Sequence, residues 1–192
     1  MSMVSNLKRF GIDAHREVAA DGQISFTIGE SATTSLKSHT FHGGIEAEEG
    51  ASSEHWWHDD VLLQGERDAM AAAFPAFTEL LSEDDMPPVW YGTVNTGAGS
   101  FEVAVLHRVD HSLPRVVPLG TKRLGRAQGK GWVAAPHLYL NGNLCVASPE
   151  DWDNESDTAA TVVGWAAHWY ACYTAWFVTG RWPLESYRAD AA

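Results

Sequence analysis

The chain has 192 residues, and its 25 acidic against 13 basic side chains give a formal net charge of −12. At ~150 residues per domain, this length predicts one domain with an appendage, and a domain of that size buries enough surface to fold unaided. A strongly acidic protein is poorly suited to binding the phosphate backbone of a nucleic acid. No apolar run approaches the ~20 residues that a membrane helix needs. We therefore expect neither a nucleic-acid nor a membrane partner.

The cysteine content and the N-terminus point to a location inside the cell. Two cysteines are too few for a disulfide framework in a chain of this length. Lys8 and Arg9 are not followed by the apolar segment that a secretory signal requires. We therefore expect a cytoplasmic protein with reduced thiols.

The first 60 residues differ from the remainder in composition. Residues 23–28 alternate apolar and polar side chains, which predicts a strand. Residues 29–53 are rich in Ser, Thr, Gly and Glu and show no clear period. We therefore divide the chain into an N-terminal extension of unassigned role, residues 1–60, and a folded domain, residues 61–192.

The domain begins with a helical pattern and continues with strands. Residues 66–81 carry apolar side chains at helical spacing, and Pro75 within them predicts a kink or a break. The elements predicted next, from alternation and turn residues, are strands over 89–96 and 101–109, a short extended piece over 115–117 between two prolines, and a loop over 120–131.

A long helix ends the domain. Ser156 or Asp157 is placed to cap a helix that begins near Thr158, and Gly180 with Pro183 after it forms a stop signal. Helix, antiparallel strands, loop and helix in this order predict an α+β fold with helices packed on a β-meander. The apolar face of this helix is predicted to hold Trp165, Trp169, Cys172, Tyr173 and Trp176.

Two further side chains of this helix are given structural interpretations. Cys172 lies between aromatic residues on the apolar face, so we expect a buried structural thiol. His168 is expected on the adjacent helix surface.

The other cysteine follows a tight turn. The segment Pro-His-Leu-Tyr-Leu-Asn-Gly-Asn-Leu-Cys ends at Cys145, and its Asn141-Gly142 pair predicts that the chain reverses just before the cysteine. Cys145 is then expected at a fixed place near the surface, with His137 close by. The leucines predicted to anchor the two sides of this turn in the core are Leu138, Leu140 and Leu144.

The charge around Cys145 is uneven. Residues 111–149 contain no acidic side chain, and positive surroundings favour the thiolate, which is the nucleophilic form of cysteine. The residues alone leave two interpretations open: a nucleophilic cysteine beside basic groups, or a solvated basic loop around a small buried cysteine. The basic side chains of the stretch are Arg115, Lys122, Arg123, Arg126 and Lys130.

The segment before Cys145 resembles the active-site region of ubiquitin-conjugating enzymes, whose pattern is His-Pro-Asn, a few residues, Gly, one residue, a branched apolar residue and Cys. Aligned back from Cys145, Leu144, Gly142 and Pro136 match family positions. Ala135 and His137 depart from the pattern, because they stand where the family has its histidine and its asparagine.

The resemblance extends over residues 61–182. The order of helix, meander and proline-bearing loop is similar to the family, and Trp152 follows the cysteine near a family tryptophan. A tryptophan-rich last helix followed by Thr-Gly-x-Trp, residues 179–182, most resembles the bacterial members that occur in antiviral defence operons with an activating enzyme.

The resemblance implies a UBC-like α+β fold and a transferase without metal or organic cofactor. Cys145 would accept the C-terminus of a ubiquitin-like protein as a thioester from a ubiquitin-activating-like enzyme and pass it to an amine of a target protein. His137 is the candidate for the role of the family asparagine, as an oxyanion donor or as a base toward the amine. Second candidates for the donor are Tyr139, Asn141 and Asn143.

Other interpretations stay open beside this one. The same fold with an altered active site would suit an adaptor that binds an activating enzyme or a ubiquitin-like protein. A cysteine hydrolase is a poorer alternative, because no Asp or Asn that orients His137 can be identified. Two histidine pairs, His39 with His42 and His55 with His58, have zinc-ligand spacing but no cysteine ligand, and we expect no metal there. Trp56 and Trp57 are expected to anchor the N-terminal extension on the domain.

Overall fold

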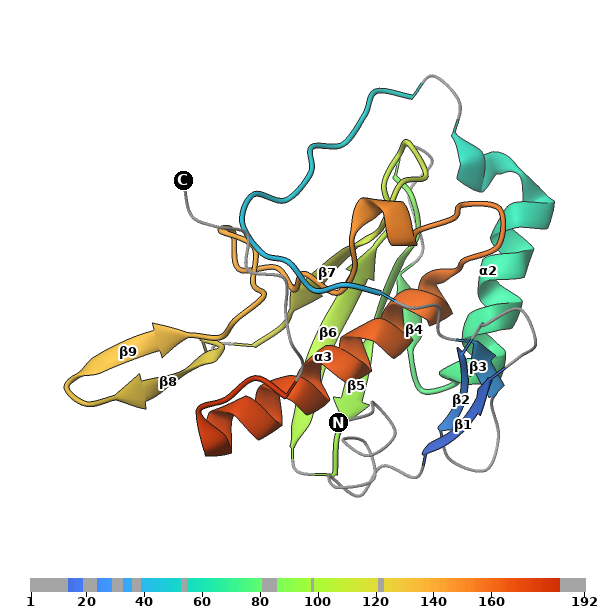
Figure 1. Ribbon diagram of the computed structural model, residues 1–192. Coiled ribbons are helices and arrows are strands. Elements are labelled where there is room, and N and C mark those ends of the chain that lie inside the picture. Colours follow the sequence, from blue (N-terminus) through green and yellow to red (C-terminus); the bar gives the residue numbers. More distant parts are fainter. Residues whose placement is uncertain are drawn as a thin grey trace.

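The computed structural model describes residues 14–18, 24–28, 33–35, 39–52, 55–80, 86–97, 99–120 and 123–183. In these residues two α-helices and three antiparallel sheets form an α+β fold, which confirms the predicted class (Figure 1). Within the same residues, neither helix combines the length and the apolar character that crossing a membrane demands. The features specific to a ubiquitin-conjugating fold remain a prediction.

The central sheet has four strands in the order β4-β5-β6-β7, all antiparallel. The strands β5 (Val89–Asn95), β6 (Ser100–Leu106) and β7 (Arg115–Pro118) lie where the sequence predicts extended structure. Two of the side chains that this sheet contributes to the core, Val103 and Val105, are completely buried. The sheet therefore forms one wall of the hydrophobic core.

Helix α2 (Asp60–Ala73) ends earlier than the sequence predicts. It begins after Asp59, whose carboxylate accepts hydrogen bonds from the first free backbone N–H groups. The break predicted at Pro75 is confirmed, whereas the helical pattern predicted beyond it to residue 81 is wrong, because Thr78–Leu80 forms β4 on the sheet edge. The Phe77 ring then lies over Gly92 of β5, where an added Cβ would be 2.6 Å from the ring.

The expected loop over 120–131 is also partly wrong. Gly125–Gln128 forms β8 and pairs with β9 (Gly131–Ala134), and this hairpin projects away from the central sheet (Figure 1). All four residues of β9 are exposed. Strands are predicted from sequence by an alternation of buried apolar and exposed polar side chains. Strand β9 buries none of its side chains, so the sequence has no such alternation there.

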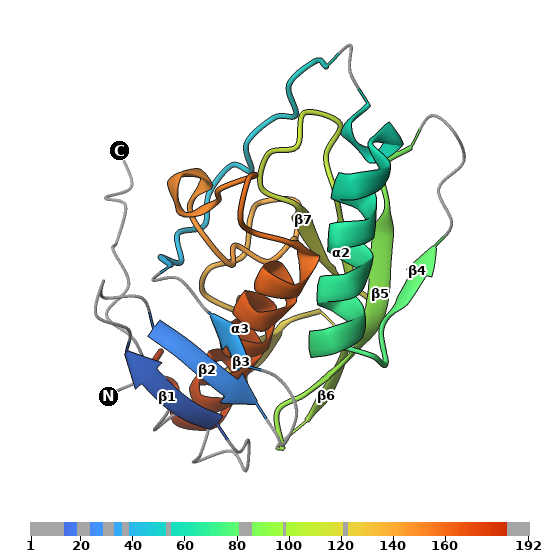
Figure 2. The same cartoon turned by 90° about the vertical axis from the view of Figure 1, so that its right-hand side faces the viewer.

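Helix α3 (Ala159–Thr179) confirms the predicted start and stop but not the predicted single face. Thr158 itself is the N-cap, and Gly180 at the C-cap has a φ of +76° and donates its N–H to the Trp176 carbonyl. Every residue from 159 to 176 is buried, because α3 crosses the sheet and is covered on its other sides by α2 and by loops (Figure 2). His168, expected on the surface, is therefore only 5% exposed.

A small separate sheet precedes these elements. Its strands are β1 (Ala14–Val18), β2 (Ile24–Ile28) and β3 (Thr33–Ser35), all antiparallel in this order. The strand predicted over 23–28 is confirmed as β2. Strand β3 lies beside α3 (Figure 2).

Candidate active site around Cys145

A tight hairpin leads into Cys145. Gly142 has a φ of +91°, a value that favours glycine, and its N–H donates to the Tyr139 carbonyl at 2.9 Å. Leu138 pairs with Leu144 across the hairpin, so the predicted reversal is confirmed. Leu144 is buried as expected, but Leu140 is 81% exposed. The expectation for Leu140 is wrong: this residue lies at the start of the turn, and its N–H donates to the Gly44 carbonyl while its side chain is exposed.

The backbone of Cys145 is fixed from two sides. Its N–H donates to the His137 carbonyl at 3.1 Å, and the preceding Leu144 N–H donates to Val116 of β7 at 2.9 Å. The thiol is completely buried, which corrects the expectation of a site near the surface. Its Sγ accepts a hydrogen bond from the His42 N–H at 3.2 Å and lies 3.9 Å from the Ala147 carbonyl.

The thiol is buried because residues 39–50, here called the covering segment, cross the hairpin in extended form (Figure 1). Gly44 forms a parallel bridge with Tyr139, and its carbonyl accepts from the Leu140 N–H at 2.8 Å. Gly43 has a φ of +119°, and an added Cβ there would lie 3.3 Å from the Leu138 carbonyl. This close backbone approach requires glycine.

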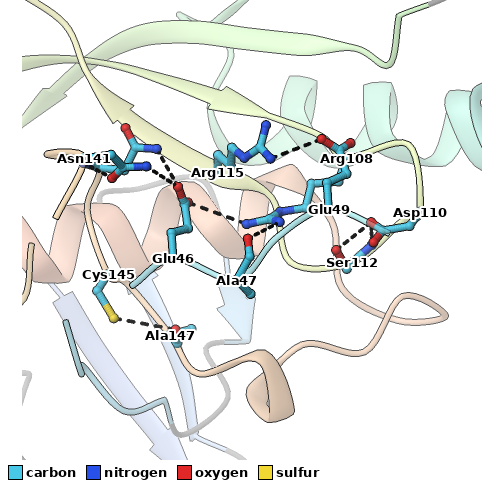
Figure 3. A network of polar contacts seen from close by, with 11 residues as sticks. Glu46, Ala47, Glu49, Arg108, Asp110, Ser112, Arg115, Asn141, Cys145 and Ala147 are labelled. Carbon is cyan, nitrogen blue, oxygen red and sulfur yellow. Dashed lines mark hydrogen bonds and ion pairs between the residues drawn. The ribbon is translucent and has the colours of Figure 1, made fainter. Parts of the chain in front are cut away.

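Glu46 ties the covering segment to the hairpin. Its Oε2 accepts from the side-chain amides of Asn141 and Asn143 at 2.7 and 2.8 Å, and its Oε1 lies 3.6 Å from Nη2 of Arg108 (Figure 3). The two predicted amide donors are therefore engaged by a carboxylate from the N-terminal extension. Arg108 completes the attachment by donating from Nη1 to the Ala47 carbonyl at 2.7 Å.

A second carboxylate of the covering segment holds its far end. Glu49 pairs with Arg115 of β7 at 3.2 Å, and its other oxygen accepts from the Val109 N–H (Figure 3). The segment is further held by Thr40, which donates to Asp151 at 2.9 Å, and by Gly50, which donates to Asp110 at 2.6 Å.

These contacts change the expected electrostatics. Glu46 and Glu49 come from outside the acid-free stretch, so counting charges near Cys145 in the sequence missed them. Arg126 instead lies at the C-terminal end of α3, where Nη1 donates to the last carbonyls at 3.4 Å. Lys122 lies outside the described residues.

His137 joins the hairpin, α3 and the covering segment. It has a φ of +58°, which is uncommon for a residue with a side chain, and its carbonyl accepts both from Cys145 and from Nε1 of Trp169 at 2.9 Å. Its Nδ1 lies 2.8 Å from the His42 carbonyl, whereas Nε2 is buried without a hydrogen-bond partner. Burial lowers the pKa of His137, so the ring is neutral at pH 7.

Tyr139 is the third predicted residue at the thiol. Burial, followed by a hydrogen bond with Cys145, raises the pKa of Tyr139, so its hydroxyl stays protonated. The structure thus brings Cys145, His137 and Tyr139 together, and it places Asn141 and Asn143 on Glu46.

An aromatic cluster supports His137 from the C-terminal side. The chain turns after Gly180 and places Trp182 with its ring 4.9 Å from His137 and 5.6 Å from Trp169. Phe41 of the covering segment packs against the His137 ring at 5.8 Å. The Thr-Gly-x-Trp sequence was the signal for Trp182, whereas nothing in the sequence indicated Phe41, His42 or Glu46.

The remaining predicted features have structural contacts. Cys172 is completely buried, and burial raises the pKa of this thiol, as expected for a structural cysteine. Trp56 is buried and donates from Nε1 to the Arg108 carbonyl at 2.9 Å. His39 contacts His168 at 2.9 Å. In the described part of the chain, no three His, Cys, Asp or Glu side chains are grouped to hold a metal ion.

The buried histidines predict a pH-dependent stability. Burial lowers the pKa of His137 and, together with the neighbouring His39, that of His168 below the ordinary value of 6.5. Above pH 6.5 both rings are neutral in the folded and in the unfolded chain. Below pH 6.5 the two rings bind protons in the unfolded chain, whereas in the folded chain they stay neutral to lower pH. We expect the free energy of unfolding to fall by up to about 1.4 kcal/mol per pH unit for each ring.

Urea unfolding at pH 7.5, 6.5 and 5.5 measures this effect. H168Q should reduce the slope, because it removes one of the two buried rings. Equal slopes for H168Q and the wild type would contradict the assignment to His168.

Comparison with known proteins gives the family of the chain. Residues 66–189 match the family model described as Type II CBASS E2 protein, and this range includes the second part of α2, the central sheet, the Cys145 hairpin and α3. No curated protein and no solved structure matches the chain. The match spans more than half of the 192 residues. The chain therefore belongs to the Type II CBASS E2 protein family, an E2-like family of bacterial antiviral defence whose role in ubiquitin-like conjugation involves an E1-like enzyme and a ubiquitin-like protein.

Proposed function

We propose that Cys145 accepts the C-terminus of a ubiquitin-like protein as a thioester and transfers it to an amine of a target protein. The observation that carries this proposal is the position of Cys145 inside the matched range, at the end of a hairpin where its own N–H donates to the His137 carbonyl and the preceding Leu144 N–H donates to the Val116 carbonyl. A fixed thiol is what acyl transfer between two large partners requires, because the reacting atoms must meet in one geometry.

Cys145 is the better candidate of the two cysteines. Cys172 lies inside α3 among core side chains, and burial raises the pKa of its thiol, so the reactive thiolate is disfavoured there. Cys145 instead lies in a loop beside polar groups, including Tyr139 and the His42 N–H.

The chemistry consists of two acyl transfers. The Cys145 thiolate attacks the thioester carbonyl of the modifier on the activating enzyme, and the thiolate of that enzyme leaves. A target amine then attacks the new thioester, loses a proton to a base, and releases the modifier as an amide with the Cys145 thiolate as leaving group. ATP is consumed by the activating enzyme, so this chain needs no cofactor of its own.

His137 is suited to the base in the second transfer. Burial lowers the pKa of His137, so its ring is neutral at pH 7 and one ring nitrogen is able to accept a proton. We therefore take the base, of the two roles proposed for His137, as the role to test. We expect H137A to retain thioester formation and to slow discharge to lysine by about 10²-fold or more.

Single-turnover discharge of preformed thioester, followed from pH 5 to 8, measures this loss. In the wild type we expect the rate to fall below pH 6.5, where His137 takes up a proton, and H137A should lose this inflection, whereas a merely structural defect lowers the rate and keeps it. H58Q serves as the control histidine variant, and equal discharge rates for H137A and the wild type would exclude the role.

The proposal is tested by incubating the protein with its activating enzyme, the ubiquitin-like partner and ATP. We expect an adduct of the combined mass that disappears on addition of a thiol reductant. Failure to form any such adduct with an activating enzyme that is itself charged, both in the wild type and in a folded variant whose Cys145 is accessible to a thiol reagent, would overturn the proposed transfer.

One observation favours the second candidate, an adaptor of the same family without transfer activity. Cys145 is completely buried, and Ala135 and His137 replace two residues of the usual active-site pattern. An adaptor would bind the activating enzyme or the ubiquitin-like protein with the same affinity when Cys145 is replaced by alanine, and it would form no adduct. The incubation above separates the two functions.

A further inference from the structure

We infer that the covering segment, residues 39–50, is an autoinhibitory strap that blocks the Cys145 thiol and has to move before the thiol reacts. The inference rests on the proposed function in that Cys145 is taken as the acceptor. It concerns the accessibility of the thiol, which is measurable without any conjugation partner.

The block follows from the position of His42. An attacking thiol and a carbonyl carbon have to approach to about 3–3.5 Å, and the backbone nitrogen of His42 already lies 3.2 Å from Sγ. The Cys145 side chain is completely buried, so even a small reagent has no open path to the sulfur. The closed arrangement is therefore incompatible with a bulky thioester donor.

The covering segment is built to open locally. Phe41 is its one buried apolar side chain, whereas His42, Gly44 and Glu48 are exposed and Ile45 is 83% exposed. Segments that bury little apolar surface open at low free energy without unfolding of the rest. We expect Phe41 to stay in the core while the residues after it move.

Polar contacts supply most of the attachment after Phe41. Glu46 is held by two amides and lies beside Arg108, and Glu49 is paired with Arg115. Opening would release Asn141 and Asn143 from Glu46 (Figure 3). The same movement that uncovers the thiol would thus free two amide donors next to it.

Alkylation by N-ethylmaleimide tests the strap, with each cysteine followed separately by peptide mass spectrometry. In the folded wild type we expect Cys145 to react far more slowly than in the urea-unfolded chain. E46A should raise the rate at Cys145 by about tenfold, the effect expected when one charge-assisted contact is lost. E48A, which removes an exposed carboxylate of the same segment, should leave the rate unchanged.

Cys172 reports in the same sample on whether a variant has unfolded. It lies in the middle of α3 and is completely buried, so it stays unlabelled as long as the core is intact. If E46A exposes Cys172 as well, G43V replaces it as the test. A side chain at Gly43 clashes with the Leu138 carbonyl and is strained at a φ of +119°, so it lifts the segment without removing a charge.

Two results would overturn the strap: fast alkylation of Cys145 in the folded wild type, or unchanged rates in both E46A and G43V. These outcomes differ from failure of the proposed function. Slow labelling that E46A accelerates, with no thioester formed by any variant, would retain the strap and reject the transfer. Thioester formation by a protein whose Cys145 is alkylated rapidly in the folded state would retain the transfer and reject the strap.

Discussion

Replacing Cys145 by serine is expected to convert the adduct with the ubiquitin-like protein from a reductant-sensitive to a reductant-resistant species, and replacing it by alanine is expected to abolish the adduct. Serine keeps an oxygen nucleophile at the position of Sγ, so any ester that forms lacks the thioester bond that reductants cleave. Gel electrophoresis with and without reductant distinguishes the two linkages.

The second cysteine supplies the matched control for this experiment. C172A removes a buried thiol on α3, and we expect it to lower stability slightly while leaving a reductant-sensitive adduct. A reductant-sensitive adduct that persists in C145S would place the acceptor on another residue. Loss of the adduct in C172A, with the fold intact, would likewise contradict the assignment of the acceptor to Cys145.

Replacing Trp169 by alanine is expected to lower the free energy of unfolding by about 3–5 kcal/mol, the range for removing a large aromatic side chain from a core. Trp169 is completely buried, stacks on Tyr173 and donates from Nε1 to the His137 carbonyl. The same substitution should also loosen the hairpin, because His137 is held with a φ of +58° and loses one of the two donors to its carbonyl.

Urea unfolding followed by circular dichroism measures the loss of stability. W132A makes the same chemical change on the exposed strand β9, where Trp132 is 54% exposed, and we expect a change within about 0.5 kcal/mol. W169F separates packing from hydrogen bonding, because it keeps a ring and removes the indole N–H. Equal stability of W169A and W132A would contradict the assigned role of Trp169.

Local sequence patterns were sufficient where the deciding interaction is local. Gly180 at the end of α3 and Asn141-Gly142 at the tip of the hairpin depend on backbone conformations that these residues favour, and both were predicted. The strand β6 was predicted because the larger apolar side chains Phe101, Val103 and Val105 alternate along the sequence. The same local patterns were insufficient for β4, since Phe77 has helical spacing in the sequence but packs on Gly92 from a turn that leads into β4.

The candidate site shows the same division. Cys145, His137 and Tyr139 lie within nine residues of one another, and the resemblance of that segment to a known active site was enough to select them. The burial of α3 on all sides was not predictable from its spacing, because a helix pattern shows only which residues are apolar. Which partners surround a helix is decided by elements distant in sequence.

The sequence by itself determined the family, the α+β class, the hairpin before Cys145 and the choice of Cys145 over Cys172 as the proposed acceptor thiol. Only the tertiary structure decided that this thiol is buried and that Asn141 and Asn143 hold Glu46. The physical reason is the separation along the chain: about 100 residues lie between His42 and Cys145, and no local periodicity records a contact of that range. The charge of −12 counts Glu46 and Glu49 as ordinary surface acids. In the folded chain they are the covering segment's own carboxylates that attach it to Arg108 and Arg115 over the cysteine.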